Sequence, residues 1–85
     1  EEWSRFAENF DQVHGNFITR LKEKYPDLTS QEIKFSAYIR MNLNTKEIAN
    51  LLGISVRGVE IGRYRVRKKL ALSRQENLSD FLLRF

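Results

Sequence analysis

Residues 44–70 read NTKEIANLLGISVRGVEIGRYRVRKKL, and the fold of the whole chain depends on the pattern in this stretch. Asn44 followed three positions later by Glu47 is a capping box that predicts the start of a short helix. Gly53 is expected to end that helix, and Ser55 to cap the next one. Two short helices joined by about three residues with a glycine at the corner are the outline of a helix-turn-helix, whose second helix enters the DNA major groove.

The apolar spacing supports the same outline. Ala49 is small where the two helices should cross most closely, and Gly53 lies four residues after it. The expected shared core of the two helices consists of Ile48, Leu52, Ile54 and Val59. This combination is more specific than a basic helix alone, which is usually only a solvated face.

The segments on either side also predict helices, and no stretch alternates as a strand would. Thr29 and Glu32 form a second capping box, and Asn42 is suited to a left-handed turn at the end of that helix. Its inward side should hold Phe35, Tyr38, Ile39 and Leu43. A final short helix should begin after Asn77 and present Leu78, Phe81, Leu82 and Phe85 on one side.

The first 26 residues predict one long amphipathic helix that Pro26 ends. Its apolar stripe comprises Trp3, Phe6, Phe10, Val13, Phe17, Leu21 and Tyr25, and Gly15 interrupts it. The stripe either packs on its own domain or pairs with a second chain through the end between Trp3 and Phe10, and the last helix poses the same alternative. The chain thus divides into this helix, residues 1–26, and a helix-turn-helix domain, residues 27–85.

The composition disfavours an enzyme. The 85 residues include no cysteine and a single histidine, His14, which we expect on the surface. No nucleophile–base pair, metal cluster or glycine-rich phosphate loop is present, and Glu47 is best explained by capping or by an ion pair with Arg63 or Lys69. We therefore expect no catalytic residue, no metal, no cofactor and no small-molecule substrate.

Charge and hydropathy indicate where the chain works. Residues 1–44 hold six Lys/Arg and seven Asp/Glu, a net charge of −1, whereas residues 45–85 hold nine and four, a net charge of +5. The basic half favours an anionic partner, with nucleic acid ahead of a membrane surface. No apolar run is long enough to span a bilayer, so a cytoplasmic location without membrane contact is expected. The chain begins Glu-Glu rather than Met, and we expect it to be a segment of a longer protein.

A family resemblance rests on the leucine and threonine at 28–29, the glutamate three residues on, KEIANLLGIS at 46–55, R-x-VE at 57–60 and the closing KKL. Together these residues resemble the bacterial LuxR/FixJ (GerE-type) DNA-binding domain. The YPDLT lead-in and RGVEIGRYRVRKKL are similar to the output ends of membrane-anchored regulators with a propeller sensor. The resemblance implies a tetrahelical helix-turn-helix bundle without a wing that binds double-stranded DNA in sequence-specific fashion, usually as a homodimer, as the output of a signal-transduction or two-component regulator.

Helical geometry separates two sides of the fourth helix, residues 55–69. At roughly 100° per residue, Val59, Val66 and Leu70 define its buried side. The residues expected to face bases are Arg57, Glu60, Ile61, Tyr64 and Arg65. Among them, the family resemblance points to Glu60, Ile61 and Tyr64. Arginine suits guanine, Glu60 can accept from a cytosine amine, and Ile61 suits a thymine methyl.

Phosphate contacts are expected around this base-facing side. The residues assigned to them are Thr45, Lys46, Gly58, Arg63, Arg67, Lys68 and Lys69; for Lys46, Gly58 and Lys69 the assignment follows from the resemblance. Gly58 and Gly62, which stand where the family usually has Thr and His, are unfavourable inside a helix. We interpret them as places where the backbone approaches either the helix near Ala49 or a DNA phosphate.

Two other functions remain open. A promoter-recognition module of sigma-factor type shares this helix arrangement and would contact RNA polymerase. Alternatively, the chain is a protein-interaction module whose apolar stripe and last helix dock a partner, with the basic helix merely solvated. Neutralising Arg65 and Lys68 without unfolding the chain separates DNA binding from this second alternative.

Overall fold

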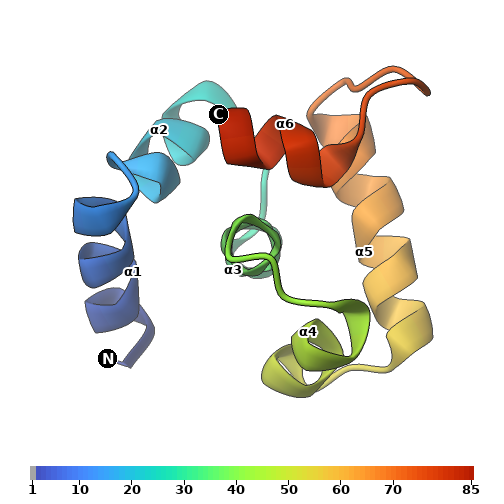
Figure 1. The fold of residues 1–85 in the computed structure, drawn as a ribbon, viewed down its shortest axis with the longest axis horizontal. Coiled ribbons are helices and arrows are strands. Elements are labelled where there is room, and N and C mark those ends of the chain that lie inside the picture. Colours follow the sequence, from blue (N-terminus) through green and yellow to red (C-terminus); the bar gives the residue numbers. More distant parts are fainter. Residues whose placement is uncertain (1) are drawn as a thin grey trace.

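A computed structural model describes residues 2–85, which form six helices and no strand. The helices are α1 (Glu2–Val13), α2 (Phe17–Lys24), α3 (Ser30–Arg40), α4 (Thr45–Leu52), α5 (Val56–Lys69) and α6 (Leu78–Arg84). In Figure 1, α3 is seen end-on at the centre, with α6 above it, α4 below, α5 on one side and α1 and α2 on the other. Helix α3 packs against α2, α4, α5 and α6, so it is the central element of an all-α fold.

The helix boundaries predicted from capping residues are confirmed. Thr29 and Asn44 each form a complete capping box, with Glu32 and Glu47 respectively, and the Ser55 side chain accepts from the third residue of α5. Asn77 caps α6 in the same way. These bonds satisfy backbone N–H groups that would otherwise lack partners in the first turn of each helix.

The prediction of one continuous N-terminal helix is wrong, because the structure has two helices there, α1 and α2. Gly15 and Asn16 both adopt left-handed backbone conformations, with φ of 63° and 61°, and they separate α1 from α2. The carboxylate of Asp11 accepts from the backbone N–H of Ile18 at 2.7 Å and of Thr19 at 3.1 Å. A side chain from α1 therefore caps α2, and a sharp bend replaces the expected straight helix.

The bend brings the apolar stripe onto the domain itself. Phe17 and Leu21 are fully buried, Phe10 is nearly so, and Phe6 lies edge-on to Tyr38 of α3, with ring centroids 6.2 Å apart. Packing on the same domain, one of the two alternatives for this stripe, is thus what the structure shows for these side chains.

His14 is not the free surface residue that was expected. It is half-buried, and its ring stacks on Phe10 with a centroid separation of 4.0 Å. Its Nδ1 accepts from Nε of Arg40 at 3.3 Å. The N–H of His14 still donates to the carbonyl of Phe10 at 2.9 Å, so His14 lies on the same side of the helix as the buried Phe10 and reaches Arg40 of α3.

Helix α6 closes the fold over α3. Leu78 and Leu82 are buried, as predicted, and two arginines bond to carbonyl oxygens near its end. Arg40 donates to the carbonyl of Leu82, and Arg20 donates to the carbonyl of Phe85. Basic side chains from α3 and α2 thus satisfy carbonyl groups that the last turn of a helix leaves unpaired. Burial and the neighbouring Arg20 lower the pKa of Arg40.

Candidate nucleic-acid interface

The turn between α4 and α5 fixes the angle of the two helices. Gly53 has a φ of 67°, in the left-handed region that favours glycine, and the N–H of Ile54 donates to the carbonyl of Ala49 at 3.0 Å. This bond belongs to the motif in which a left-handed residue ends a helix. Ser55 then accepts from Gly58, so α5 begins two residues after Ile54.

Apolar side chains hold the two helices together beneath the turn. Ile48 and Val59 are fully buried, and Ala49 is 6% exposed. Leu52 and Ile54 are half-buried and pack against the same core. The core expected from the spacing of residues 48–59 is therefore present, and it supports α5 from one side only.

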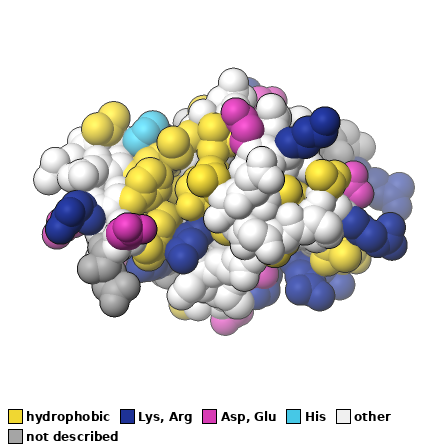
Figure 2. Space-filling model, turned by 90° about the horizontal axis from the view of Figure 1, so that it is seen from below, with side chains coloured by type: hydrophobic (Ala, Val, Ile, Leu, Met, Phe, Trp, Pro, Cys, Tyr) yellow, Lys and Arg dark blue, Asp and Glu magenta, His cyan; other side chains and the backbone are white. Residues whose placement is uncertain are grey.

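The outer side of α5 is exposed and carries all the residues predicted to face bases. These are Arg57, Glu60, Ile61, Tyr64 and Arg65. Val59, Val66 and Leu70 are buried on the opposite side, as the helical geometry predicted. Ile61 is 43% exposed and Tyr64 64%, so two large apolar side chains lie among the charges. In Figure 2, Lys and Arg side chains gather toward the end of the molecule that α5 occupies in Figure 1.

The residues predicted to contact phosphate divide into two groups. Lys46 and Lys68 are exposed, and Lys68 lies over the Tyr64 ring with its Nζ 5.6 Å from the centroid; Thr45 and Arg63 are half-buried. Arg67 instead donates to the carbonyls of Ser73 and Glu76, each at 2.7 Å, and so holds the loop before α6.

Lys69 and Gly58 have intramolecular partners as well. Nζ of Lys69 lies 2.7 Å from Oε1 of Glu32 and also donates to the carbonyl of Asp27. The N–H of Gly58 donates to Oγ of Ser55 at 3.0 Å. An approaching phosphate would have to displace these partners, so Lys46 and Lys68 are the stronger phosphate candidates.

The Glu32–Lys69 pair ties α3 to the end of α5. Burial by itself would raise the pKa of Glu32, but the hydrogen bonds from Lys69 and Thr29 outweigh it, so the pKa of this carboxyl lies below its ordinary value. Glu32 is therefore ionised at neutral pH. The pair leaves Lys69 partly neutralised. Within residues 2–85, the unpaired positive charge at this part of α5 is therefore carried by Arg65 and Lys68.

Neither glycine of α5 packs closely against the helix near Ala49, which was one of the two interpretations from the sequence. The atoms nearest to a Cβ added at Gly62 belong to the Phe35 ring of α3, at 3.6 Å, and not to Ala49. At Gly58 they belong to Ile54 and Ser55, at 3.4 Å. Both distances are ordinary van der Waals contacts, so close approach to the helix near Ala49 does not explain these glycines, and approach to a DNA phosphate stays a prediction.

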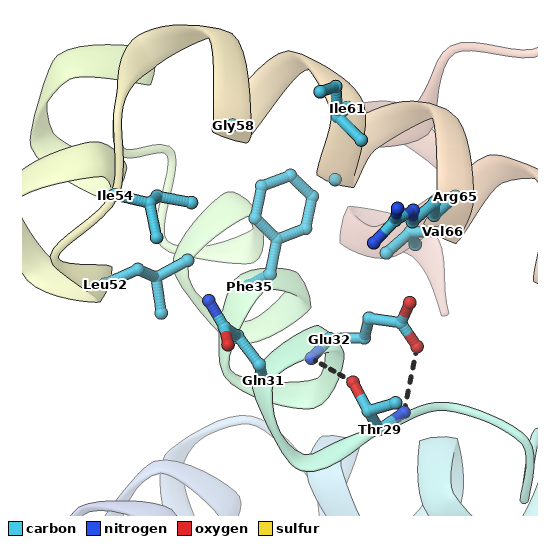
Figure 3. A pocket seen from close by; sticks show the side chains of 11 residues that line it. Thr29, Gln31, Glu32, Phe35, Leu52, Ile54, Gly58, Ile61, Arg65 and Val66 are labelled. Atoms are coloured by element: carbon cyan, nitrogen blue, oxygen red, sulfur yellow. Dashed lines mark hydrogen bonds between the residues drawn. The ribbon is translucent and has the colours of Figure 1, made fainter.

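Sequence reasoning missed the part that α3 plays beside α5. Gln31, Glu32 and Phe35 border a pocket whose other walls come from α5 and from the end of α4 (Figure 3). The sequence pattern also did not indicate that Leu51 would be 57% exposed beside the half-buried Leu52. Only the distance between α3 and α5 in space reveals the pocket, and no local pattern encodes that distance.

Comparison of the chain with models of protein families, with curated protein sequences and with solved structures gives no match. Within residues 2–85, no helix is long and apolar enough to cross a membrane. The same residues contain no group of three or more histidine, aspartate or glutamate side chains placed to hold a metal ion. The described part of the chain is an all-helical fold with one exposed basic helix.

Proposed function

We propose that the chain binds double-stranded DNA in sequence-specific fashion by inserting α5 into the major groove, as the output module of a bacterial transcriptional regulator. The observation that carries this proposal is the outer side of α5, which is exposed, basic and held from behind by the buried side chains that α4 and α5 share. A helix of 14 residues is about 21 Å long, and the major groove is about 12 Å wide, so α5 fits it. This function would place the module in the cytoplasm.

The exposed side chains supply both kinds of contact that such a helix needs. Arg57 and Arg65 are suited to guanine, Glu60 to a cytosine amine, and Ile61 to a thymine methyl. Lys46 on α4 precedes these residues in the chain, and Lys68 follows them near the end of α5. They would position the helix on phosphates without reading sequence.

A homodimer would double the contact with DNA, because helix-turn-helix dimers bind two half-sites about one helical turn apart. Most of the apolar surface of α1 and α6 is used inside the domain, since Phe10, Leu78 and Leu82 are buried. Leu83 of α6 is 51% exposed and Val13 at the end of α1 is 79% exposed. We assign a dimer contact to the outer side of α6, around Leu83.

A protein-interaction module is the second candidate, and one observation favours it. Leu51 of α4 and Val56, Ile61 and Tyr64 of α5 are all more than 40% exposed. Large exposed apolar side chains can serve as protein contacts. RNA polymerase is the partner that a regulator or a sigma-type module would contact there.

Selection from a pool of random DNA duplexes tests the proposed function. The wild-type chain should enrich a defined sequence. Glu60→Ala should relax the preference at one base pair, whereas Lys68→Ala should weaken all sequences about equally. Enrichment of no sequence, in a chain that remains folded, would contradict sequence-specific binding and would favour the protein-interaction module.

A further inference from the structure

Both glycines of α5 line a pocket between α5 and α3. Neither Gly58 nor Gly62 has a positive φ, and a Cβ at either position would make only ordinary contacts, at 3.4 Å and 3.6 Å. Glycine is nevertheless among the least favourable residues inside a helix. With no side chain at either position, the α5 wall of the space between α5 and α3 is bare backbone there.

This space is a pocket of about 390 Å³, within the range of small-molecule sites, which are about 300–1,000 Å³. Leu52 and Ile54 form one end, Phe35 rises from α3 toward α5, and Arg65 and Val66 lie at the other end (Figure 3). We call it the glycine pocket. An apolar end and a charged end, with glycine backbone between them, suit an elongated ligand of mixed character.

The free charge of the glycine pocket is positive. Glu32, its one carboxylate, is already paired with Lys69 at 2.7 Å and accepts from the N–H of Thr29. Arg65 is exposed, and within residues 2–85 it forms no ion pair. Its guanidinium group points toward the pocket in Figure 3. Guanidinium groups bind carboxylates through two parallel hydrogen bonds, so this end favours an anion.

We propose that the glycine pocket binds a small aromatic carboxylate. The ring lies beside the Phe35 ring, over Gly58 and against Leu52 and Ile54, and the carboxylate accepts hydrogen bonds from Arg65. The consequence for DNA rests on the proposed function, in which Arg65 faces the bases. A bound carboxylate occupies Arg65 and adds negative charge beside α5, so ligand and DNA compete, and the ligand lowers the affinity for DNA.

NMR titration of the whole chain with phenylacetate, without DNA, tests the site independently of the proposed function. Phenylacetate should shift the backbone amide signals of Gly58, Gly62 and Phe35 saturably, with a Kd on the order of 1 mM, as expected for a ligand of this size. Phenylacetamide, which has the same shape and no charge, should bind at least about threefold more weakly.

Two variants locate the site. Gly62→Leu fills the pocket and should abolish the shifts; its fold is checked by circular dichroism. Arg65→Gln should remove the preference for phenylacetate over phenylacetamide, whereas the matched control Arg74→Gln, which changes an exposed arginine outside the pocket, should keep it. If Gly62→Leu does not fold, the Arg65→Gln comparison decides alone.

Three results would overturn the proposal: no saturable shift at tens of millimolar phenylacetate, equal binding of the acid and the amide, or shifts unchanged by a folded Gly62→Leu. A second titration adds duplex DNA, whose affinity should fall in phenylacetate for the wild type and not for Gly62→Leu. If phenylacetate binds in the pocket but no duplex binds at all, the proposed function fails while the site stands.

Discussion

Replacing Gly62 by alanine should stabilise the protein, although the position faces the interior. The new methyl group would lie 3.6 to 3.9 Å from three atoms of the Phe35 ring, which is van der Waals contact without a clash. The backbone already has a negative φ that alanine adopts freely. Helix propensity then favours alanine by about 1 kcal/mol, with part of the gain coming from the reduced entropy of the unfolded chain.

Urea unfolding followed by circular dichroism measures this gain, and thermal unfolding should show a rise in Tm of about 4–8 °C for a domain of this size. Gly53→Ala is the matched control. Its φ of 67° lies in the left-handed region, and no atom lies within 4 Å of the added Cβ. That variant should lose about 1–2 kcal/mol from backbone strain alone.

The outcome at Gly62 separates two explanations of the glycines. A gain in the free energy of unfolding means that packing against α3 does not require glycine, as the contacts indicate. A loss of 1 kcal/mol or more would mean that the Phe35 ring cannot accept the methyl group and that close packing accounts for the residue after all. That result would also remove the first step of the argument for the glycine pocket.

Three further predictions concern stability. Asp11→Ala removes the carboxylate that caps α2 from α1, and urea unfolding should show a loss of about 1–2 kcal/mol; an unchanged midpoint would contradict the capping role. Ala71→Gly should add about 1 kcal/mol, because Ala71 has a φ of 57° in the left-handed region, and a loss would contradict this. Glu32 has a lowered pKa, so its contribution to stability is complete above the pKa of an unfolded-state glutamate and is lost as the pH falls through the folded value. Acid unfolding of Glu32→Gln should therefore lack this part of the pH dependence, and a curve parallel to that of the wild type would refute it.

Features set by neighbours in the chain were predictable from the sequence. The capping boxes at Thr29 and Asn44 join residues three apart, and the left-handed residues Asn42 and Gly53 follow from local backbone preferences. The two sides of α5 also followed from helical geometry, since Val59 is buried and Tyr64 is exposed.

Features set by distant partners were not predictable. Gly15 was recognised as an interruption, but the break depends on Asp11 reaching the N–H groups of residues seven and eight positions away. Lys69 was assigned to phosphate from the family resemblance, and its partners Glu32 and Asp27, 37 and 42 residues away, are not visible in the local pattern. The glycine pocket likewise depends on how closely α3 approaches α5, which no spacing within either helix encodes.

The measurement that tests the account most directly is the salt dependence of binding to a duplex of random sequence, followed by fluorescence anisotropy. The wild type is compared with Arg65→Ala plus Lys68→Ala, and with Arg5→Ala plus Lys22→Ala as the control. The control removes the same charge from exposed positions on α1 and α2.

If α5 is the DNA-contacting helix, a plot of the logarithm of the affinity against the logarithm of the salt concentration should have a slope of about −0.9 for each neutralised phosphate. The Arg65/Lys68 variant should flatten that slope by about 0.9 for each of the two charges that contacts phosphate, while the control leaves it nearly unchanged. Equal slopes for the two folded variants, or no salt-sensitive binding by the wild type, would contradict the assignment of α5 to DNA.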